Sequence, residues 1–139
     1  MVNVRFVFVY TGIRVRDLDR SIEFYTRVLG MRLLRREKVD ENKGEFAMLG
    51  CDGSDHGLEL NWYSDESPIA RPYPEDEGEE LDHLAFEVEN LEASLTFLKA
   101  QGYPPVMGPV VDDRFAVAYV KDPDSIWVEF YQRLDGDNR

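Results

Sequence analysis

Apolar residues recur at every second position in several short segments of the chain, which is the pattern of a half-buried β-strand. In the segment 6–15, Ile13 and Val15 share one face of the predicted strand. Tyr10 and Arg14 alternate with them and point to the other face. The same pattern predicts further strands at residues 31–39, 44–50, 57–63, 81–88, 105–110, 115–121 and 126–132.

Two segments show helical spacing of their apolar residues instead of alternation. Asp17 or Asp19 can cap the first predicted helix, which Gly30 ends. Asn90 caps the second helix, which runs to Gly102. Each helix therefore stands between one strand and three further strands, and the order βαβββ occurs twice.

The two halves of the chain also resemble each other in sequence. A single shift places Tyr10 on His83 and Val15 on Val88. We interpret this as an internal duplication, in which each half supplies one βαβββ module. The duplication predicts the α+β fold class.

The length and 43% hydrophobic content fit one domain over residues 1–139. We expect its two modules at about residues 4–64 and 81–132, with a linker at about residues 65–80. The acidic run 74–82 is interpreted as a solvated connection, in preference to a local cation-binding segment.

Each module ends in a strand that carries a single acid between apolar neighbours, Glu59 in the first and Glu129 in the second. A buried carboxylate without a partner is costly, so each acid must be ion-paired, hydrogen-bonded or metal-bound. A duplicated fold would bring Tyr10, Glu59, His83 and Glu129 around one pseudo-two-fold axis. The sequence therefore predicts a metal site, and an ion pair of the acids with Arg14 or another arginine is the alternative.

Composition excludes several classes of protein and site. The single cysteine, Cys51, rules out a disulfide within the chain and a zinc-thiolate cluster, so a metal would be held by imidazole and carboxylate. A net charge of −12 disfavours nucleic acid and anionic membrane as partners. No apolar run approaches the roughly 20 residues that span a bilayer, and we expect a soluble cytoplasmic protein.

Three segments carry a resemblance to a known family: "YTGIRVRDLDRSIEFYTRVLGMRLL", "LDHLAFEVENLEASLTFLKAQG" and "DPDSIWVEF". They resemble the vicinal oxygen chelate superfamily, also described as the glyoxalase, bleomycin resistance and dioxygenase family, and within it the glyoxalase I (lactoylglutathione lyase) branch. The resemblance implies two tandem βαβββ modules that form a curved mixed sheet around a cleft. It also implies one divalent metal ion, held by a residue from each of four strands.

The resemblance assigns residues to that metal site. Glu59, His83 and Glu129 match three of the family's metal ligands, and Tyr10 stands where glyoxalases have His or Gln. The metal could be Zn, Ni, Co, Mn or Fe. We expect Tyr10 to hydrogen-bond a metal-bound water or a substrate oxygen, or to line the pocket wall, in preference to ligating the metal as a phenolate.

The function implied is that of a lyase or isomerase that moves a proton next to a carbonyl through a metal-stabilised enediolate, with Glu129 as the base. Arg14 matches an arginine that helps to hold the glutathione carboxylate in glyoxalase I, but Tyr63 and Glu79 replace other parts of that pocket. We therefore expect a small substrate other than the glutathione adduct.

Two tryptophans complete the expected site. Trp62 and Trp127, together with Tyr63 and Tyr131, can shape an apolar pocket for the substrate, although packing within the sheet explains them equally well. Many relatives place their site between two chains, so the resemblance also implies a homodimer.

Two other functions remain open at this point. The first is a non-catalytic small-molecule-binding protein of the bleomycin-resistance kind, although such relatives generally lack the ligands that this chain carries. The second is an Fe(II) dioxygenase, whose usual ligands in this superfamily are two His and one Glu. With Tyr10 at the first position, His83 is the only histidine of that set.

Overall fold

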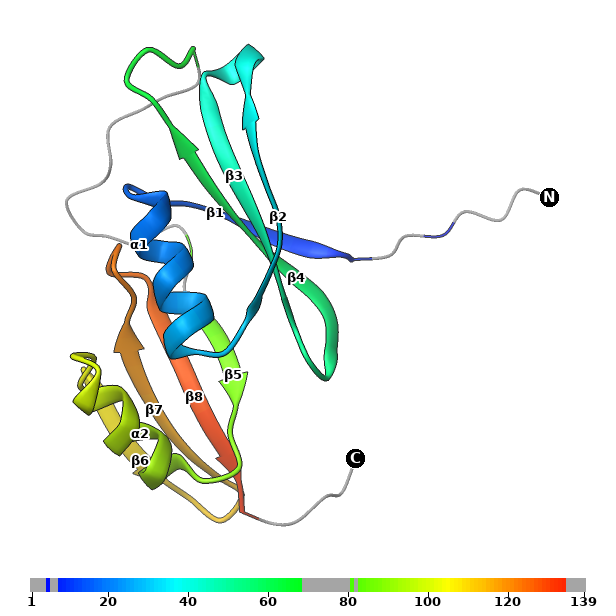
Figure 1. The fold of residues 1–139 in the computed structure, drawn as a ribbon. Coiled ribbons are helices and arrows are strands. Elements are labelled where there is room, and N and C mark those ends of the chain that lie inside the picture. Colours follow the sequence, from blue (N-terminus) through cyan, green and yellow to red (C-terminus); the bar gives the residue numbers. More distant parts are fainter. Residues whose placement is uncertain (1–4, 6–7, 69–80, 82, 135–139) are drawn as a thin grey trace. The chain divides into compact units, whose positions relative to one another are not determined.

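The computed structural model describes most of the chain, namely residues 5, 8–68, 81 and 83–134. It divides the chain into two compact units, Met1–Pro72 and Tyr73–Arg139. In its described part, each unit contains a four-stranded mixed sheet and an α-helix (Figure 1). The expected α+β fold with two βαβββ modules is confirmed.

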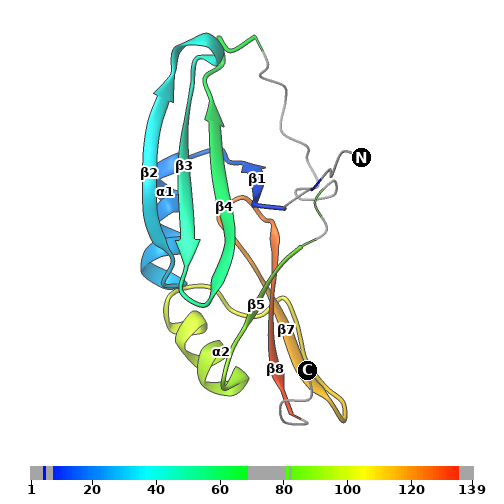
Figure 2. The same cartoon turned by 90° about the vertical axis from the view of Figure 1, so that its right-hand side faces the viewer.

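The first unit has its strands in the order β1-β4-β3-β2. β1 runs parallel to β4, whereas β3 pairs antiparallel with both β2 and β4. Figure 2 shows β2, β3 and β4 side by side. The elements of this unit are β1 (Tyr10–Arg14), α1 (Leu18–Glu23), a π-helical segment η1 (Phe24–Val28), β2 (Arg32–Val39), a 3₁₀ turn η2 (Asp40–Asn42), β3 (Gly44–Cys51) and β4 (Ser54–Tyr63).

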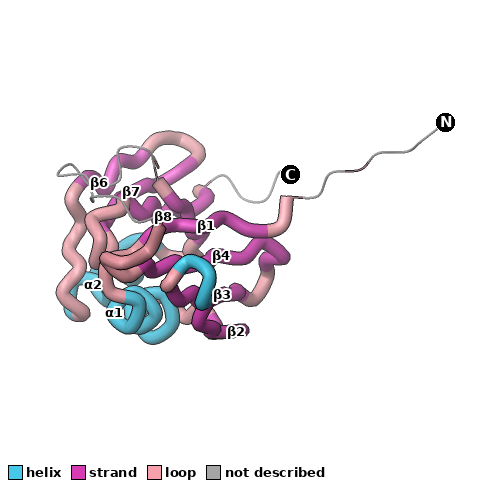
Figure 3. The backbone as a smooth tube through the Cα atoms, turned by 90° about the horizontal axis from the view of Figure 1, so that it is seen from above, coloured by secondary structure: helices cyan, strands magenta, loops and turns pink. Residues whose placement is uncertain are grey.

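The second unit repeats this arrangement with the strand order β5-β8-β7-β6. β5 runs parallel to β8, and β7 pairs antiparallel with β6 and β8. Figure 3 marks its helix in cyan and its strands in magenta. The elements are β5 (Leu84–Glu87), α2 (Leu91–Ala100), β6 (Met107–Val111), β7 (Phe115–Lys121) and β8 (Trp127–Arg133).

The strand registers confirm that the two units are built alike. Gly12 of β1 lies opposite Glu59 of β4, and Ala85 of β5 lies opposite Glu129 of β8. The shift that relates Tyr10 to His83 in the sequence also relates Gly12 to Ala85. The two strand acids therefore occupy equivalent places in their sheets.

One face of each sheet forms a hydrophobic core with the helix of its unit. In the first unit α1 contacts β3 and β4, and in the second α2 contacts β7 and β8. The most buried sheet residues on this helix-covered face, each at least 93% buried, are almost all aliphatic. They are Ile13, Ala47, Leu49, Leu58 and Leu60 in the first unit, and Ala116, Ala118, Val120, Val128 and Phe130 in the second.

The alternate residues of the same strands point to the other face, which we call the open face of each sheet. Glu59 and Glu129 are half-buried there, between fully buried neighbours on either side in the sequence. Each open face can therefore carry polar groups without disturbing the core.

Helix boundaries follow the expected capping residues. Asp17, rather than Asp19, caps α1 by accepting a hydrogen bond from the backbone N–H of Arg20. Asn90 caps α2 in the same way. Gly30, which follows η1, has a φ of 79°, a conformation that glycine adopts without strain.

Some segments differ from the sequence-based prediction. β4 begins at Ser54, three residues before the strand predicted at residues 57–63, so His56 belongs to a strand and is half-buried. Its Nε2 is hydrogen-bonded to Thr11 Oγ1 at 2.8 Å, across from the end of β1. Most of the expected linker and acidic run lies outside the described residues. No helix in the described ranges is long and apolar enough to cross a membrane.

Candidate functional site

A histidine and a carboxylate meet on the open face of the second sheet. His83 immediately precedes β5, and Glu129 lies in the middle of β8, the parallel neighbour of β5. His83 Nε2 lies 3.6 Å from Glu129 Oε1, with the two side chains 34% and 19% exposed. The structure thus brings together two of the three predicted metal ligands, in a position that solvent can reach.

Tyr119 of β7 lies beside the same two residues, although no pattern in the sequence singled it out. It lies directly opposite Glu129 in the β7–β8 register, and its hydroxyl donates a 2.7 Å hydrogen bond to Glu129 Oε1. Its ring meets the His83 ring edge to face, with centroids 5.6 Å apart. We refer to His83, Tyr119, Trp127 and Glu129 as the β8 cluster.

Trp127 shares the open face with Glu129, because the two residues are separated by one position on β8. Its ring centroid is 5.6 Å from that of Tyr119, at an interplanar angle of 57°. The predicted substrate contact Trp127 therefore lies beside the two candidate ligands of this unit.

Glu59 occupies the corresponding place on the open face of the first sheet. A Cβ atom placed on Gly12, its partner in β1, would lie 3.6 Å from Glu59 Oε1. Because Gly12 has no side chain, β1 leaves this side of the Glu59 carboxylate uncovered. Tyr10 lies on the same face of β1, 43% exposed, at the position equivalent to His83.

Arg14 lies at the other end of β1, opposite Asn61, and faces the same side as Glu59. Its guanidinium carbon is 5.9 Å from the centroid of the Tyr63 ring, a cation–π arrangement. The sheet therefore holds the Arg14 guanidinium beside Tyr63 on the open face, where it can attract an anionic group.

Trp62 points to the opposite side of β4 from Glu59, because it is separated from Glu59 by an odd number of positions. It alternates with Glu59 and shares the helix-covered face with Leu60. The aromatic residue of β4 on the open face is Tyr63 instead. Trp62 and Glu59 therefore lie on opposite faces of the sheet, which favours the alternative that Trp62 packs within the sheet.

The donor atoms present suit a divalent transition metal. Imidazole nitrogen and carboxylate oxygen are common ligands of Zn, Ni, Co, Mn and Fe. Within the described residues, no three His, Cys, Asp or Glu side chains gather into a metal-binding group. The second unit by itself therefore provides a pair of candidate ligands, His83 and Glu129.

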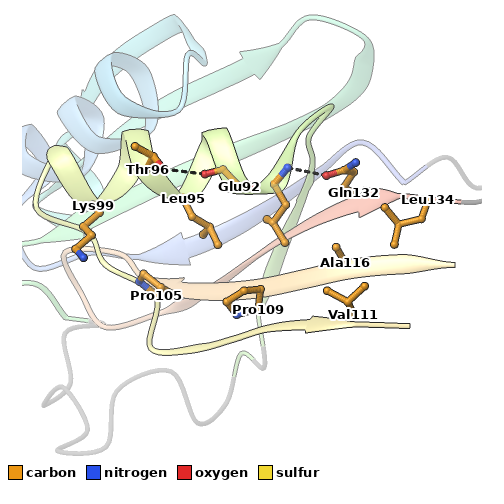
Figure 4. A pocket seen from close by; sticks show the side chains of 11 residues that line it. Glu92, Leu95, Thr96, Lys99, Pro105, Pro109, Val111, Ala116, Gln132 and Leu134 are labelled. Carbon is orange, nitrogen blue, oxygen red and sulfur yellow. Dashed lines mark hydrogen bonds between the residues drawn. The ribbon is translucent and has the colours of Figure 1, made fainter. Parts of the chain in front are cut away.

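A separate cavity of about 540 Å³ lies in the second unit between α2 and strands β6 and β7 (Figure 4). Ala116 and Gln132, which belong to the helix-covered face of the sheet, contribute to its wall. Gln132 Oε1 accepts a 2.8 Å hydrogen bond from the Leu91 N–H at the start of α2. None of the predicted site residues lines this cavity, so it is distinct from the β8 cluster.

Comparison with known proteins assigns the chain to a family. Residues 7–130 match the model of the Glyoxalase/Bleomycin resistance protein/Dioxygenase superfamily. The chain belongs to this superfamily. The match includes both units and every residue of the predicted site.

Individual relatives narrow the comparison to one branch of the superfamily. The chain is 36% identical over 129 residues to a probable lactoylglutathione lyase of Vibrio cholerae, covering 88% of each chain. It is 35% identical over 129 residues to the lactoylglutathione lyase of Haemophilus influenzae, covering 88% of this chain and 90% of the relative. These similarities support a glyoxalase-like lyase.

A solved structure agrees with the sequence relatives. The trypanothione-dependent glyoxalase I of Leishmania major superimposes with a TM-score of 0.73 at 30% identity, covering 92% of this chain and 87% of that one. The fold and the branch suggested by the sequence motifs are therefore both supported by independent comparisons.

Proposed function

We propose that this protein is a metal-dependent glyoxalase-family lyase or isomerase, which moves a proton next to a carbonyl in a small substrate other than the glutathione adduct. The observation that carries the proposal is the pair formed by His83 Nε2 and Glu129 Oε1, 3.6 Å apart on the open face of the second sheet. Membership of the superfamily and similarity to lactoylglutathione lyases support it.

Three residues form the proposed donor set. His83 offers an imidazole nitrogen, and Glu59 and Glu129 offer carboxylate oxygens from equivalent positions of the two sheets. A divalent metal held by them would polarise the substrate carbonyl as a Lewis acid. Zn, Ni, Co, Mn and Fe all suit this chemistry and these donors.

Glu129 is the proposed base. Its carboxylate takes the proton from the carbon next to the carbonyl and returns it to the neighbouring carbon, so that no oxidant or reductant is consumed. The Tyr119 hydroxyl occupies one lone pair of Oε1, and the other carboxylate lone pairs remain for this task.

Substrate binding is assigned to residues of the two open faces. Arg14 is proposed to bind an anionic group of the substrate, and Tyr10 and Trp127 to contact its apolar or hydroxylated parts. The absence of the other glutathione-binding residues supports a substrate that is not the glutathione adduct. The homodimer that the resemblance implies and the cytoplasmic location expected from the sequence belong to the same proposal.

The test is turnover of hemithioacetals made from 2-oxoaldehydes and a panel of thiols that includes glutathione. We expect the wild-type protein to convert at least one of them, and Glu129→Gln to lower kcat by about 10²- to 10⁴-fold, because the base is lost. Glu87→Gln is the matched control, since Glu87 lies on the neighbouring strand β5 with an exposed side chain paired to Arg133. Wild-type turnover in Glu129→Gln would refute the role of this base.

A metal-free binding protein is the second candidate function. Tyr10 favours it, because a phenol stands at the position equivalent to His83. The two functions are distinguished by the same panel: saturable ligand binding without turnover and without metal would support the binding protein.

A further inference from the structure

The two strand acids differ in the residue that lies directly across from each. Tyr119 lies opposite Glu129 in the β7–β8 register, whereas Met48 lies opposite Glu59 in the β3–β4 register. Tyr119 donates a hydrogen bond to its acid, and a methionine has no hydrogen to donate. Both halves of the chain therefore carry the strand carboxylate. Only Glu129 has a tyrosine hydroxyl opposite it on the antiparallel neighbouring strand.

The phenol is held in place by packing on both sides. The Tyr119 ring meets the His83 ring at 89° and the Trp127 ring at 57°, each with centroids 5.6 Å apart. Such ring contacts restrict the rotation of the tyrosine side chain. The hydroxyl is thus aimed at Glu129 Oε1 by the surrounding side chains as well as by its own hydrogen bond.

We propose that Tyr119 is a positioning residue for the metal site. Its hydroxyl fixes the orientation of the Glu129 carboxylate, and the edge-to-face contact of its ring supports the His83 imidazole. Partners that orient metal ligands commonly contribute to metal affinity, since less ligand motion is lost on binding. The inference rests on the proposed function, because it takes Glu129 and His83 as ligands.

The experiment measures zinc affinity of the metal-free protein by competition with a chromophoric chelator. Tyr119→Phe removes the hydroxyl and keeps the ring, so we expect the Kd for Zn²⁺ to rise by about 10- to 100-fold. Tyr119→Met introduces the residue found opposite Glu59 and should weaken binding at least as much, because the ring contact with His83 is also lost.

The control variant removes a similar hydroxyl elsewhere on the same sheet. Tyr131 donates a 3.4 Å hydrogen bond to the exposed Glu87, so Tyr131→Phe should leave the Kd unchanged. Unfolding curves of the metal-free variants distinguish a loss of zinc affinity from a loss of folding stability. A purely structural role would lower stability without a specific loss of zinc affinity.

Two results would overturn the inference, and they are distinguishable. If Tyr119→Phe binds zinc as tightly as the wild type, the positioning role is wrong and the proposed function stands. If the wild-type protein binds no zinc, nickel, cobalt, manganese or iron, the metal-dependent function and the positioning role both fail.

Discussion

At the scale of single residues, the site depends on a few side chains that break the apolar pattern of their strands. Glu59 and Glu129 stand at equivalent points of the two sheets, and within the second sheet Glu129 has His83 and Tyr119 beside it, whereas Met48 lies opposite Glu59 in the first. Duplication explains the shared geometry, and substitution at individual positions explains the different chemistry. The second unit therefore provides two of the three proposed metal ligands, His83 and Glu129, together with the tyrosine that contacts both.

Arg14 tests the residue-level assignment of substrate binding. If Arg14 binds an anionic group, Arg14→Ala should raise KM by about tenfold, the effect of losing roughly 1.4 kcal/mol of binding, and change kcat little. Steady-state kinetics with an anionic substrate measure this. Arg27→Ala is the control, because Arg27 is an exposed residue of η1 that pairs with Glu23. An unchanged KM in Arg14→Ala would contradict the assignment.

At the scale of elements, two aspartates organise the turns beside strands β7 and β8. Asp122 is 96% buried and accepts hydrogen bonds from the backbone N–H groups of Asp124 and Ile126, at 2.7 and 2.9 Å. Asp112 accepts from the N–H groups of Arg114 and Phe115 where β6 turns into β7. The Asp122 turn connects β7 to β8 and so helps to place Tyr119 opposite Glu129, whereas the Asp112 turn connects β6 to β7.

Replacement of Asp122 should destabilise the protein strongly. Asp122→Ala leaves two buried N–H groups without their acceptor, and we expect the free energy of unfolding to fall by about 3 kcal/mol. Asp122→Asn retains the acceptor oxygen and should lose about 1 kcal/mol or less. Denaturant unfolding measures both variants, and equal losses for Ala and Asn would show that the hydrogen bonds do not hold the turn.

The turn at Asp112 should respond to acid. Hydrogen bonds from the N–H groups of Arg114 and then Phe115 lower the pKa of the Asp112 carboxyl below its usual range. Because the folded-state pKa is depressed, its stabilising contribution is present above the unfolded-state pKa and is lost as the pH falls through the folded-state value.

Nuclear magnetic resonance can follow that titration directly. The amide resonances of Arg114 and Phe115 should shift with a midpoint below that of an ordinary aspartate, and Asp112→Asn should abolish the transition. A midpoint at or above the ordinary aspartate value would contradict the hydrogen-bonded turn.

At the scale of the whole molecule, the internal repeat made the architecture predictable. The βαβββ order, the helix caps and most strand positions follow from local patterns, and the structure confirms them. Partner residues on adjacent strands were harder to predict. The role of Tyr119 depends on how the turn at Asp122 sets the β7–β8 register, and turn signals in a sequence do not fix that register.

Two further differences have similar physical causes. His56 lies in a strand because β4 extends N-terminally beyond Gly57, the predicted start of the strand, where pairing with β3 continues. Trp62 was assigned to the site because it is aromatic. The face of the sheet on which it lies is set instead by alternation along β4, where an odd number of positions separates it from Glu59. The candidate ligands were found because the repeat related them, which single-residue properties could not do.

The most direct test of the metal-dependent assignment is metal content by elemental mass spectrometry, on protein purified without chelators or a histidine tag and then reconstituted. The protein should carry close to one divalent metal ion per chain, and His83→Ala should lose it. His56→Ala is the matched control, because His56 is the chain's other histidine and is hydrogen-bonded to Thr11. Absence of metal from the wild type, or equal metal content in His83→Ala, would contradict a metal site built on His83.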